Sequence, residues 1–509
     1  MSSASHPATP PAASARRDGA FAAAGAIFLA LTAAAAAWHL RRLGAPAWPL
    51  DDAYITLHNA RALIEGDPSF PGVPALFGAT SLLHTLAVAA GHLAGSAEWA
   101  LWALSWAAVA LSGLGVLAAG RALGLGAGWS LALALAAVFA GRFYYVMLNG
   151  LETGWVFAIV IWMLALAARD PFSRGAALLC GLAPFVRPEL GAVSAALMLG
   201  MLSDARREGR RAEALRALAW CVAPASALLA AQWSLSGAPL PRTGFAKRAF
   251  FAQPQLGPWI PRAYFAAKAL EFIAGTSGLM LALAAARGPV ARRATLAALA
   301  LIAAMAALYP VVSIQNGKRL LWVFLPIAAF ALASRAASGR GAVPARVFIA
   351  LALAATAAGF FFKAPIDLRL IGDQRARLQA TARWIERNLD PSAPLLLHDV
   401  GHVAWATDLP LVDLVGLKTP FSQKVHARLT ARRGPEAVPE ATEIIARRFG
   451  ARTMLTLEDW EAGFRFAEGL RARGWRVTRL SHENLGGYVF HAIVPPEEAA
   501  GGATEEDAR

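Results

Sequence analysis

The chain has 509 residues, of which 57% are hydrophobic and only 16% are charged. An average soluble domain is about 45–50% apolar, so this composition excludes an ordinary soluble protein, and several apolar runs of membrane-spanning length indicate a polytopic membrane protein. The net charge of +15 does not indicate a nucleic-acid partner, because the Lys and Arg residues cluster in short loops between apolar runs, where they set membrane topology.

The amino-terminal segment, residues 1–19, begins with the basic sequence MSSASHPATPPAASARR, which is rich in Pro, Ala and Ser. This composition predicts a disordered cytoplasmic tail and not a cleaved signal peptide. Both cysteines, Cys180 and Cys221, lie inside apolar runs. Their positions exclude a disulfide framework and a Cys-x-x-Cys metal site.

A series of apolar runs follows in chain order and predicts transmembrane helices. The run at 175–203 is too long for one span and contains the sequence Arg187-Pro188-Glu189. Because proline disfavours helix in the residue before it, this run is expected to form two helices that meet at one membrane face. The chain then crosses the membrane about eleven times. The other runs lie at 20–40, 98–120, 128–145, 152–168, 217–234, 267–286, 294–312, 319–335 and 346–362.

Loops rich in arginine predict how these spans are oriented. The loops at 204–216, 286–293 and 334–346 are expected to be cytoplasmic, because short cytoplasmic loops carry an excess of Lys and Arg. Residues 41–97 then form the first outer loop. The apolar segment at 80–95 within this loop is interpreted as an interfacial or re-entrant helix, because it is long enough only for a marginal span.

The composition changes after residue 362. Residues 20–362 form the predicted transmembrane domain, whereas residues 363–495 carry frequent charges and alternate between helical and strand-like patterns, which predicts an α/β domain. Residues 496–509 predict a disordered acidic tail. The predicted fold class is therefore a polytopic α-helical protein of the cytoplasmic (inner) membrane, with about eleven transmembrane helices and a C-terminal extracytoplasmic α/β domain.

Two adjacent carboxylates, Asp51 and Asp52, follow the first apolar run. Apolar residues then recur at helical spacing from Ala53 to Ile64, which predicts an amphipathic helix at the membrane surface with Gly66 as its C-cap. One aspartate can cap the start of this helix by accepting a backbone N–H. The other carboxylate is then left ionised near the positive end of the helix dipole and is available for function.

The expected topology brings further charged residues to the same side of the membrane, and charges near the ends of apolar spans tend to line cavities. Arg and Lys bind phosphate oxygens, and a carboxylate can deprotonate an acceptor hydroxyl. The set predicts a site for an anionic amphiphile such as a lipid phosphate carrying a sugar, with one aspartate as general base and its neighbour as helix cap, metal ligand or orienting group. The candidates for phosphate binding are Arg187, Arg242, Lys247, Lys318 and Arg319, and the supporting residues are Tyr54, Glu152, Glu189, Asp399 and His402.

At these residues the sequence resembles a known family. The motifs are DDAYITLHNARALIEGDPSF after the first span, NGLET opening a later one, RPE at a helix break, PLPRTGFAK in an outer loop and HDVGHVAWATDLPLVDLVGL in the exported domain. Together they resemble the GT-C superfamily of polyprenyl-phosphate-sugar-dependent membrane glycosyltransferases, especially a bacterial branch similar to the mycobacterial terminal arabinofuranosyltransferase. The chain departs from that pattern at TLHNARA and GATS, where the family has aromatic residues.

The resemblance implies inverting transfer of a sugar, with arabinofuranose as the first candidate, from a polyprenyl-phosphate donor to an envelope glycan or lipid acceptor on the outer face of the membrane. It implies Asp51 as the general base and Asp52 as a supporting or metal-binding residue, and it leaves a divalent cation open as cofactor. The expected partners are the lipid-linked donor, the glycan or glycolipid acceptor and membrane lipids, with no nucleic acid. The alternatives are a transporter or flippase of lipid-linked intermediates, a protein O-mannosyltransferase-like enzyme and a lipid A aminoarabinose transferase-like enzyme.

Overall fold

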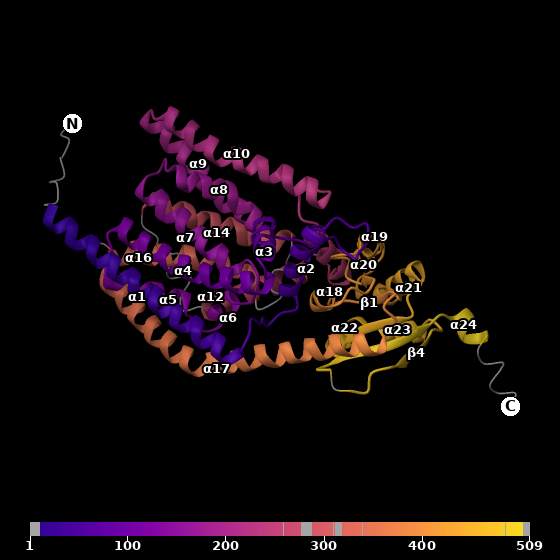
Figure 1. The fold of residues 1–509 in the computed structure, drawn as a ribbon. Coiled ribbons are helices and arrows are strands. Elements are labelled where there is room, and N and C mark those ends of the chain that lie inside the picture. Colours follow the sequence, from indigo (N-terminus) through magenta and orange to yellow (C-terminus); the bar gives the residue numbers. More distant parts are fainter. Residues whose placement is uncertain are drawn as a thin grey trace.

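The computed structural model describes residues 11–257, 259–275, 288–308, 310, 318–337, 339, 341–483 and 485–501. These residues form a large bundle of helices and a smaller domain built on a five-stranded sheet (Figure 1). The bundle takes up the first part of the chain, and the sheet lies at its far end beside the carboxyl terminus. This arrangement confirms the predicted α-helical fold class with a C-terminal α/β domain.

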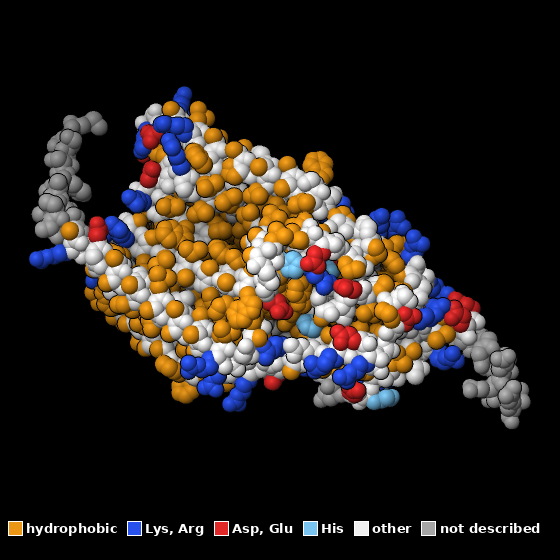
Figure 2. All heavy atoms as spheres, viewed as in Figure 1, with side chains coloured by type: hydrophobic (Ala, Val, Ile, Leu, Met, Phe, Trp, Pro, Cys, Tyr) orange, Lys and Arg blue, Asp and Glu red, His pale blue; other side chains and the backbone are white. Residues whose placement is uncertain are grey.

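Among the described residues, six helices are long and apolar enough to cross a membrane. Their outer faces are apolar: Leu215 of α10 is 63% exposed, and Phe361 and Phe362 of α17 are 76% and 79% exposed. Figure 2 shows that hydrophobic side chains cover much of the bundle, whereas charged side chains gather over the sheet domain and at the opposite end. The exposed apolar side chains on these helices are stable where lipid surrounds them. The helices are α1 (Pro11–Leu43), α4 (Ala97–Leu123), α10 (Arg211–Ser236), α14 (Pro289–Leu308), α16 (Phe324–Ala337) with the preceding η3 (Arg319–Val323), and α17 (Ala342–Asn388).

Shorter helices complete the bundle, and their limits bear out two local predictions. The long apolar run is broken at Arg187, whose backbone is extended (φ −152°, ψ 130°) because Pro188 follows it. The surface helix after the aspartates runs from Asp52 to Glu65 and ends at Gly66, with φ 90°. The helices are α2 (Asp52–Glu65), α3 (Leu82–Leu93), α5 (Ala127–Val138), α6 (Gly141–Met147), α7 (Thr153–Arg169), α8 (Arg174–Val186), α9 (Leu190–Glu208), α11 (Thr243–Phe250), η1 (Pro254–Leu256) and α12 (Trp259–Gly275).

The bundle core requires close approach between helices. A Cβ atom at Gly113 of α4 would lie 1.9 Å from the ring of Phe28 on α1, so only glycine fits there. Phe28 is fully buried and belongs to the same apolar cluster as Val160 of α7 and Phe324 of α16. Close packing therefore holds α1, α4, α7 and α16 together, as expected for helices in lipid.

Helix α17 joins the bundle to the sheet domain without a linker. It is 47 residues long, and the predicted domain boundary at 362/363 falls inside it. Its first half carries the exposed apolar residues described above, and its second half packs on the sheet, where Trp384 stacks on Phe490 with ring centroids 4.0 Å apart. The change in composition after residue 362 marks where α17 passes from its apolar half to the half that packs on the sheet. The helix itself is continuous across this boundary.

The sheet has the order β2-β1-β3-β5-β4. The first three strands are parallel, with Leu396 of β1 opposite Val412 of β2 and Met454 of β3, and β5 is antiparallel to both β3 and β4. The buried strands are apolar because both faces are covered. The strands are β1 (Leu395–Leu397), β2 (Leu411–Asp413), β3 (Thr453–Leu457), β4 (Arg476–Arg479) and β5 (Tyr488–Val494), and the helices are α18 (Gly401–Ala406), α19 (Pro420–Arg428), α20 (Thr430–Arg433), η4 (Pro435–Ala437), α21 (Val438–Phe449), α22 (Glu458–Phe464) and α23 (Phe466–Ala472).

Both predicted disordered tails are partly helical. Helix α1 begins at Pro11, so residues 11–19 belong to it, and α24 (Pro496–Gly501) forms part of the acidic tail. Composition misled the prediction here, because Ala is a strong helix former and Pro is accommodated in the first helical turn. Residues 1–10 and 502–509 lie outside the described part of the chain.

The first outer loop lies between the bundle and the sheet domain. Tyr54 and Leu57 of α2 share an apolar cluster with Val403 of α18 and Leu409. The backbone N–H of Leu411, at the start of β2, donates to the carbonyl of Ser69, 2.9 Å away. These contacts bring the Asp51–Asp52 pair against residues that are about 350 positions later in the chain.

Candidate active site

The carboxylate of Asp51 binds the start of α18. Its Oδ2 accepts from the backbone N–H of Gly401 at 2.6 Å, and its Oδ1 accepts from that of His402 at 2.7 Å. A Cβ atom at residue 401 would lie 2.1 Å from the Asp51 carbonyl oxygen, so the contact requires glycine. The sequence left open which aspartate caps the helix, and the side chain of Asp51 does not do so. Asp51 is the N-cap residue of α2 but makes no cap hydrogen bond there, because a distant pair of amides takes both of its oxygens.

The position of Asp51 also shifts the pKa of its carboxyl group. Burial raises its pKa well above the usual range, and the negative charge of Asp399 raises it further. The two backbone amides act in the opposite direction, because they stabilise the ionised carboxylate. Asp51 thus links the first outer loop to the sheet domain through a carboxylate whose two oxygens are already engaged.

Asp52 lines the space between the bundle and the sheet domain. It is the first residue of α2 and lines a cavity of about 780 Å³, which we call the acidic cavity. Its Oδ2 lies 3.7 Å from Nζ of Lys247 on α11, at ion-pair distance. Asp52 also lines a small neighbouring cavity of about 50 Å³ together with Glu152. The ionisable residues that line the acidic cavity are Asp51, Asp52, Lys247, Arg377, His398, Asp399, Glu458, Asp459 and Tyr488.

The sheet supplies the far wall of the acidic cavity. Asp399 follows β1, and its Oδ2 accepts from the hydroxyl of Tyr488 at 2.8 Å. Trp460 lies just after β3 and lines the same cavity. His402 packs edge-on against Tyr54, with ring centroids 4.7 Å apart, beside the Asp51 contact. The predicted supporting residues Tyr54, Asp399 and His402 are therefore brought to the aspartate pair.

A second cavity, of about 1030 Å³, lies on the other side of α11. We call it the cationic cavity, because Arg242, Arg248, Arg262 and Lys424 line it, and its described lining residues include no Asp or Glu. Its remaining walls are largely apolar, with Leu240, Phe245, Pro254 and Pro261 among them, and Phe251 lines both large cavities.

Other predicted phosphate-binding residues lie apart from these two cavities. Arg187 is 1% exposed and pairs with Glu152, with Nε–Oε1 3.7 Å, and with Glu189. The structure thus brings these three predicted residues together, but the two glutamates already balance the arginine charge. Lys318 pairs with Glu271 at 2.7 Å. The side chain of Arg319 lies outside the described residues.

The sequence reading missed several residues of the acidic cavity. Glu458, Asp459 and Trp460 follow a strand-like run, and Arg377 lies in the second half of α17. The sequence signal that could have identified Glu458 and Asp459 is their position directly after a strand-like run. As to metals, no group of three His, Cys, Asp or Glu side chains that could hold an ion occurs in the part of the chain that the structure describes.

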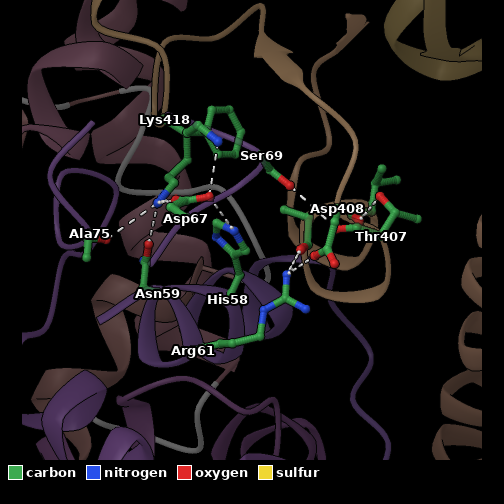
Figure 3. Close-up of polar contacts among 12 residues, drawn as sticks. His58, Asn59, Arg61, Asp67, Ser69, Ala75, Thr407, Asp408 and Lys418 are labelled. Carbon is green, nitrogen blue, oxygen red and sulfur yellow. Dashed lines mark hydrogen bonds and ion pairs between the residues drawn. The ribbon is translucent and has the colours of Figure 1, made fainter. Parts of the chain in front are cut away.

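A buried polar cluster fastens the first outer loop to the sheet domain (Figure 3). Nζ of Lys418 lies 3.2 Å from Oδ2 of Asp67 and donates to Oδ1 of Asn59 at 2.9 Å. Nε2 of His58 lies 3.1 Å from Oδ1 of the same aspartate. Burial alone would raise the pKa of Asp67, but the hydrogen bond with His58 and the charge of Lys418 lower it to about 2. Lys418 is fully buried and the side chain of Asp67 is 5% exposed, so this ion pair is largely shielded from solvent.

The contact between α11 and α19 is expected to weaken in acid. His426 is buried against Phe250, its Nε2 lies 2.6 Å from the carbonyl oxygen of Leu414, and burial lowers its pKa from 6.5 to about 4. The unfolded chain therefore binds more protons between these pH values, so the free energy of unfolding falls as pH decreases from about 6.5 to about 4. His426→Gln is expected to reduce this slope, as measured by thermal unfolding between pH 4 and 7. His482→Gln, at an exposed position, is the control, and equal slopes for wild type and His426→Gln would contradict the prediction.

Comparison with known proteins gives one partial family match and several similar folds. Residues 367–488 match a domain of unknown function, DUF8728, which comprises the second half of α17 and most of the sheet domain. No curated protein matches the sequence. In fold, the chain is similar to ArnT from Cupriavidus metallidurans, both in the apo state and bound to undecaprenyl phosphate. Each of these comparisons has 15% identity and a TM-score of 0.48, and covers 91% of this chain and 97% of that one.

The chain is also similar in fold to the arabinofuranosyltransferase AftD from Mycobacteria. That comparison has 16% identity, a TM-score of 0.48 and 91% coverage of this chain. The chain spans 40% of the length of AftD. These likenesses concern the arrangement of the elements alone.

Proposed function

We propose that the protein is a membrane glycosyltransferase that transfers a sugar from a polyprenyl-phosphate donor to a hydroxyl group of an envelope glycan or lipid. The observation that carries this proposal is the junction of the two large cavities at α11. Lys247 faces the acidic cavity, the adjacent Arg248 lines the cationic cavity, and Phe251 lines both. A lipid tail with an anionic head fits apolar walls with cations, and a polyhydroxylated sugar fits carboxylates and aromatic rings. A lipid-phosphate-linked sugar combines both parts.

The geometry favours Asp52 as the general base and Asp51 as a positioning residue, which reverses the roles implied by the family resemblance. Both oxygens of Asp51 accept backbone N–H groups, whereas Asp52 lies at ion-pair distance from Lys247 at the cavity wall. In the proposed reaction, an acceptor hydroxyl gives its proton to Asp52 as its oxygen bonds to the anomeric carbon of the donor. The bond from that carbon to the phosphate oxygen breaks, and polyprenyl phosphate leaves.

The cations at α11 stabilise the charge that develops on the departing phosphate. Lys247, Arg248 and Arg242 are the proposed phosphate contacts, because they lie on or beside the same short helix between the cavities. Charge stabilisation of this kind is usually the largest contribution to catalysis. Attack on the side opposite the phosphate inverts the anomeric centre. The proposed location is the outer face of the inner membrane, and arabinofuranose is the first donor sugar to test.

The proposal is tested by measuring release of polyprenyl phosphate from a panel of polyprenyl-phosphate sugars, with protein in nanodiscs and membrane glycan extract as acceptor. Release is expected with one donor sugar. Arg248→Gln is expected to raise the KM for that donor by about tenfold to a hundredfold, since a hydrogen bond to a charged group contributes about 1.5–3 kcal/mol.

Arg432→Gln is the matched control, because Arg432 is exposed on α20 and lines neither large cavity. It should leave the KM unchanged. Absence of release with every donor in the panel, in protein that remains folded, would reject the transferase proposal in favour of a transporter of lipid-linked intermediates.

A further inference from the structure

The acidic cavity lies at a topological switch point of the sheet. From β1, the middle one of the three parallel strands, the chain passes to β2 on one side, and from β2 it crosses to β3 on the other side. In sheets of this kind, ligands bind in the crevice outside the carboxyl ends of the parallel strands where the strand order reverses. His398 and Asp399 follow β1, and the segment 458–460 follows β3, so both flank this crevice and line the acidic cavity.

Trp460 forms an aromatic surface in this crevice. Its ring is supported by Phe464, at a centroid distance of 5.3 Å, by Phe251 at 5.8 Å and by His398 at 4.4 Å. The tryptophan is only partly buried and lines the cavity. An aromatic ring carries negative charge on its face, which attracts the polarised C–H groups of a sugar. A ring held in place from several sides is thus a suitable platform for a pyranose or furanose.

His398 completes the aromatic wall of the crevice. It is 3% exposed and lines the cavity. Its ring lies against Trp460 on one side and Phe466 on the other, with ring centroids 4.4 and 5.8 Å apart. The histidine therefore fixes the position of the tryptophan ring.

The charges of the cavity select among acceptors. Besides Asp51, whose two oxygens are engaged by backbone amides, the carboxylates that line it are Asp52, Asp399, Glu458 and Asp459, against Lys247 and Arg377 as its cations. Glu458 and Asp459 are exposed, and neither forms an ion pair with the residues that the structure describes. Ionised carboxylates only accept hydrogen bonds, so they can bind hydroxyl or ammonium groups and repel a phosphate.

We infer that the crevice between β1 and β3 is an acceptor subsite for a neutral or amino-bearing glycan, with a sugar ring stacked on Trp460 and its hydroxyl or ammonium groups bound by Glu458 and Asp459. The role of the bound glycan as acceptor rests on the proposed transferase function. Binding of a glycan in this crevice does not depend on it. The sheet domain then selects the acceptor, while the cationic cavity on the other side of α11 receives the donor lipid. Glycans whose terminal sugar is phosphorylated are excluded by charge.

The experiment measures glycan binding to the full-length protein in nanodiscs, without donor, by saturation-transfer difference NMR. The probes are an arabinofuranose tetrasaccharide, a mannose tetrasaccharide, a chitosan tetrasaccharide and a mannose 6-phosphate disaccharide. At least one neutral or amino probe is expected to bind more tightly than the phosphorylated one. Trp460→Ala is expected to weaken that binding by about tenfold or more, since truncation of a tryptophan at the centre of a binding site typically has an effect of this size.

A second variant protects the test against misfolding, because Trp460 also packs against other aromatic rings. The double substitution Glu458→Gln with Asp459→Asn changes exposed side chains only, and it should weaken the amino probe most while leaving the unfolding midpoint unchanged. Phe449→Ala, at a partly exposed ring on α21, is the matched control and should bind as wild type does.

Three results would overturn the inference: preferential binding of the phosphorylated probe, binding of no probe, and unchanged binding in both the tryptophan and the carboxylate variants. Because the measurement needs no donor, it is independent of the transferase assay. Failure of donor turnover with intact glycan binding would reject the enzyme and keep the subsite. Donor turnover without glycan binding would reject the subsite alone.

Discussion

Asp52→Asn is expected to lower sugar transfer by about a hundredfold to ten-thousandfold, the range typical for loss of a general base. The amide keeps the shape of the side chain but cannot take a proton from the acceptor hydroxyl. Because Asp52 lines the cavity and lies at 3.7 Å from Lys247, the substitution should leave the thermal unfolding midpoint close to that of wild type. The measurement is the rate of polyprenyl phosphate release at saturating donor, together with the unfolding curve.

Asp51→Asn serves as the comparison, because the two aspartates are neighbours with different partners. The amide can accept only one of the two N–H groups of α18 well, and leaving a buried donor unsatisfied costs about 1–3 kcal/mol. Amide hydrogen exchange at Gly401 and His402 should therefore accelerate in this variant and not in Asp52→Asn. If Asp51→Asn abolished transfer without faster exchange, while Asp52→Asn remained active, Asp51 would be the base after all.

Lys418→Met is expected to destabilise the protein by about 3–5 kcal/mol, the usual consequence of removing one partner of a buried ion pair. The side chains of Lys418 and Asp67 are only 1% and 5% exposed, and the pair joins the first outer loop to the sheet domain. Methionine preserves most of the side-chain volume but removes the cation, and leaves the aspartate with its contacts to His58 and to the backbone N–H of Phe70. Chemical unfolding of the purified protein measures the effect.

The double variant Lys418→Met with Asp67→Asn should recover part of the lost stability, because it removes the unpaired charge. Arg465→Met is the control, since Arg465 pairs with Glu468 at the surface of the same domain, where an ion pair is screened by solvent. It should leave the unfolding curve unchanged. An equally small effect of Lys418→Met would show that the buried cluster does not hold the loop in place.

Much of the fold was predictable because its signals are local. Apolar runs of membrane length, the Pro188 break between α8 and α9, and the period of the helix after Asp52 depend on residues close in sequence. The same is true of the strand-like runs that became β1 and β3. Secondary structure of this kind depends on the conformational preferences of neighbouring residues and on the spacing of apolar side chains, and both can be read from the sequence. The tails were the exception, because their composition suggested disorder where Ala-rich stretches form helix.

The roles of the site residues depended on contacts between distant segments. The sequence placed Asp51, Asp52, Lys247 and Asp399 in outer segments, and the structure brings them to one cavity. It could not show that Asp51 binds the amides of α18, because that contact joins residues 350 positions apart, nor that Arg187 is paired with two glutamates.

The sequence by itself determined the membrane-spanning bundle, the α/β class of the C-terminal domain and the aspartate pair after the first apolar run, because hydrophobic patterning acts along the chain. Only the tertiary structure decided that Asp51 binds the amides of α18 while Asp52 lies beside Lys247. It also decided that cations gather on one side of α11 and carboxylates on the other, and that Trp460 packs against His398. Electrostatics and packing act through space. The order of strands in the sheet, which no local pattern encodes, places those groups together.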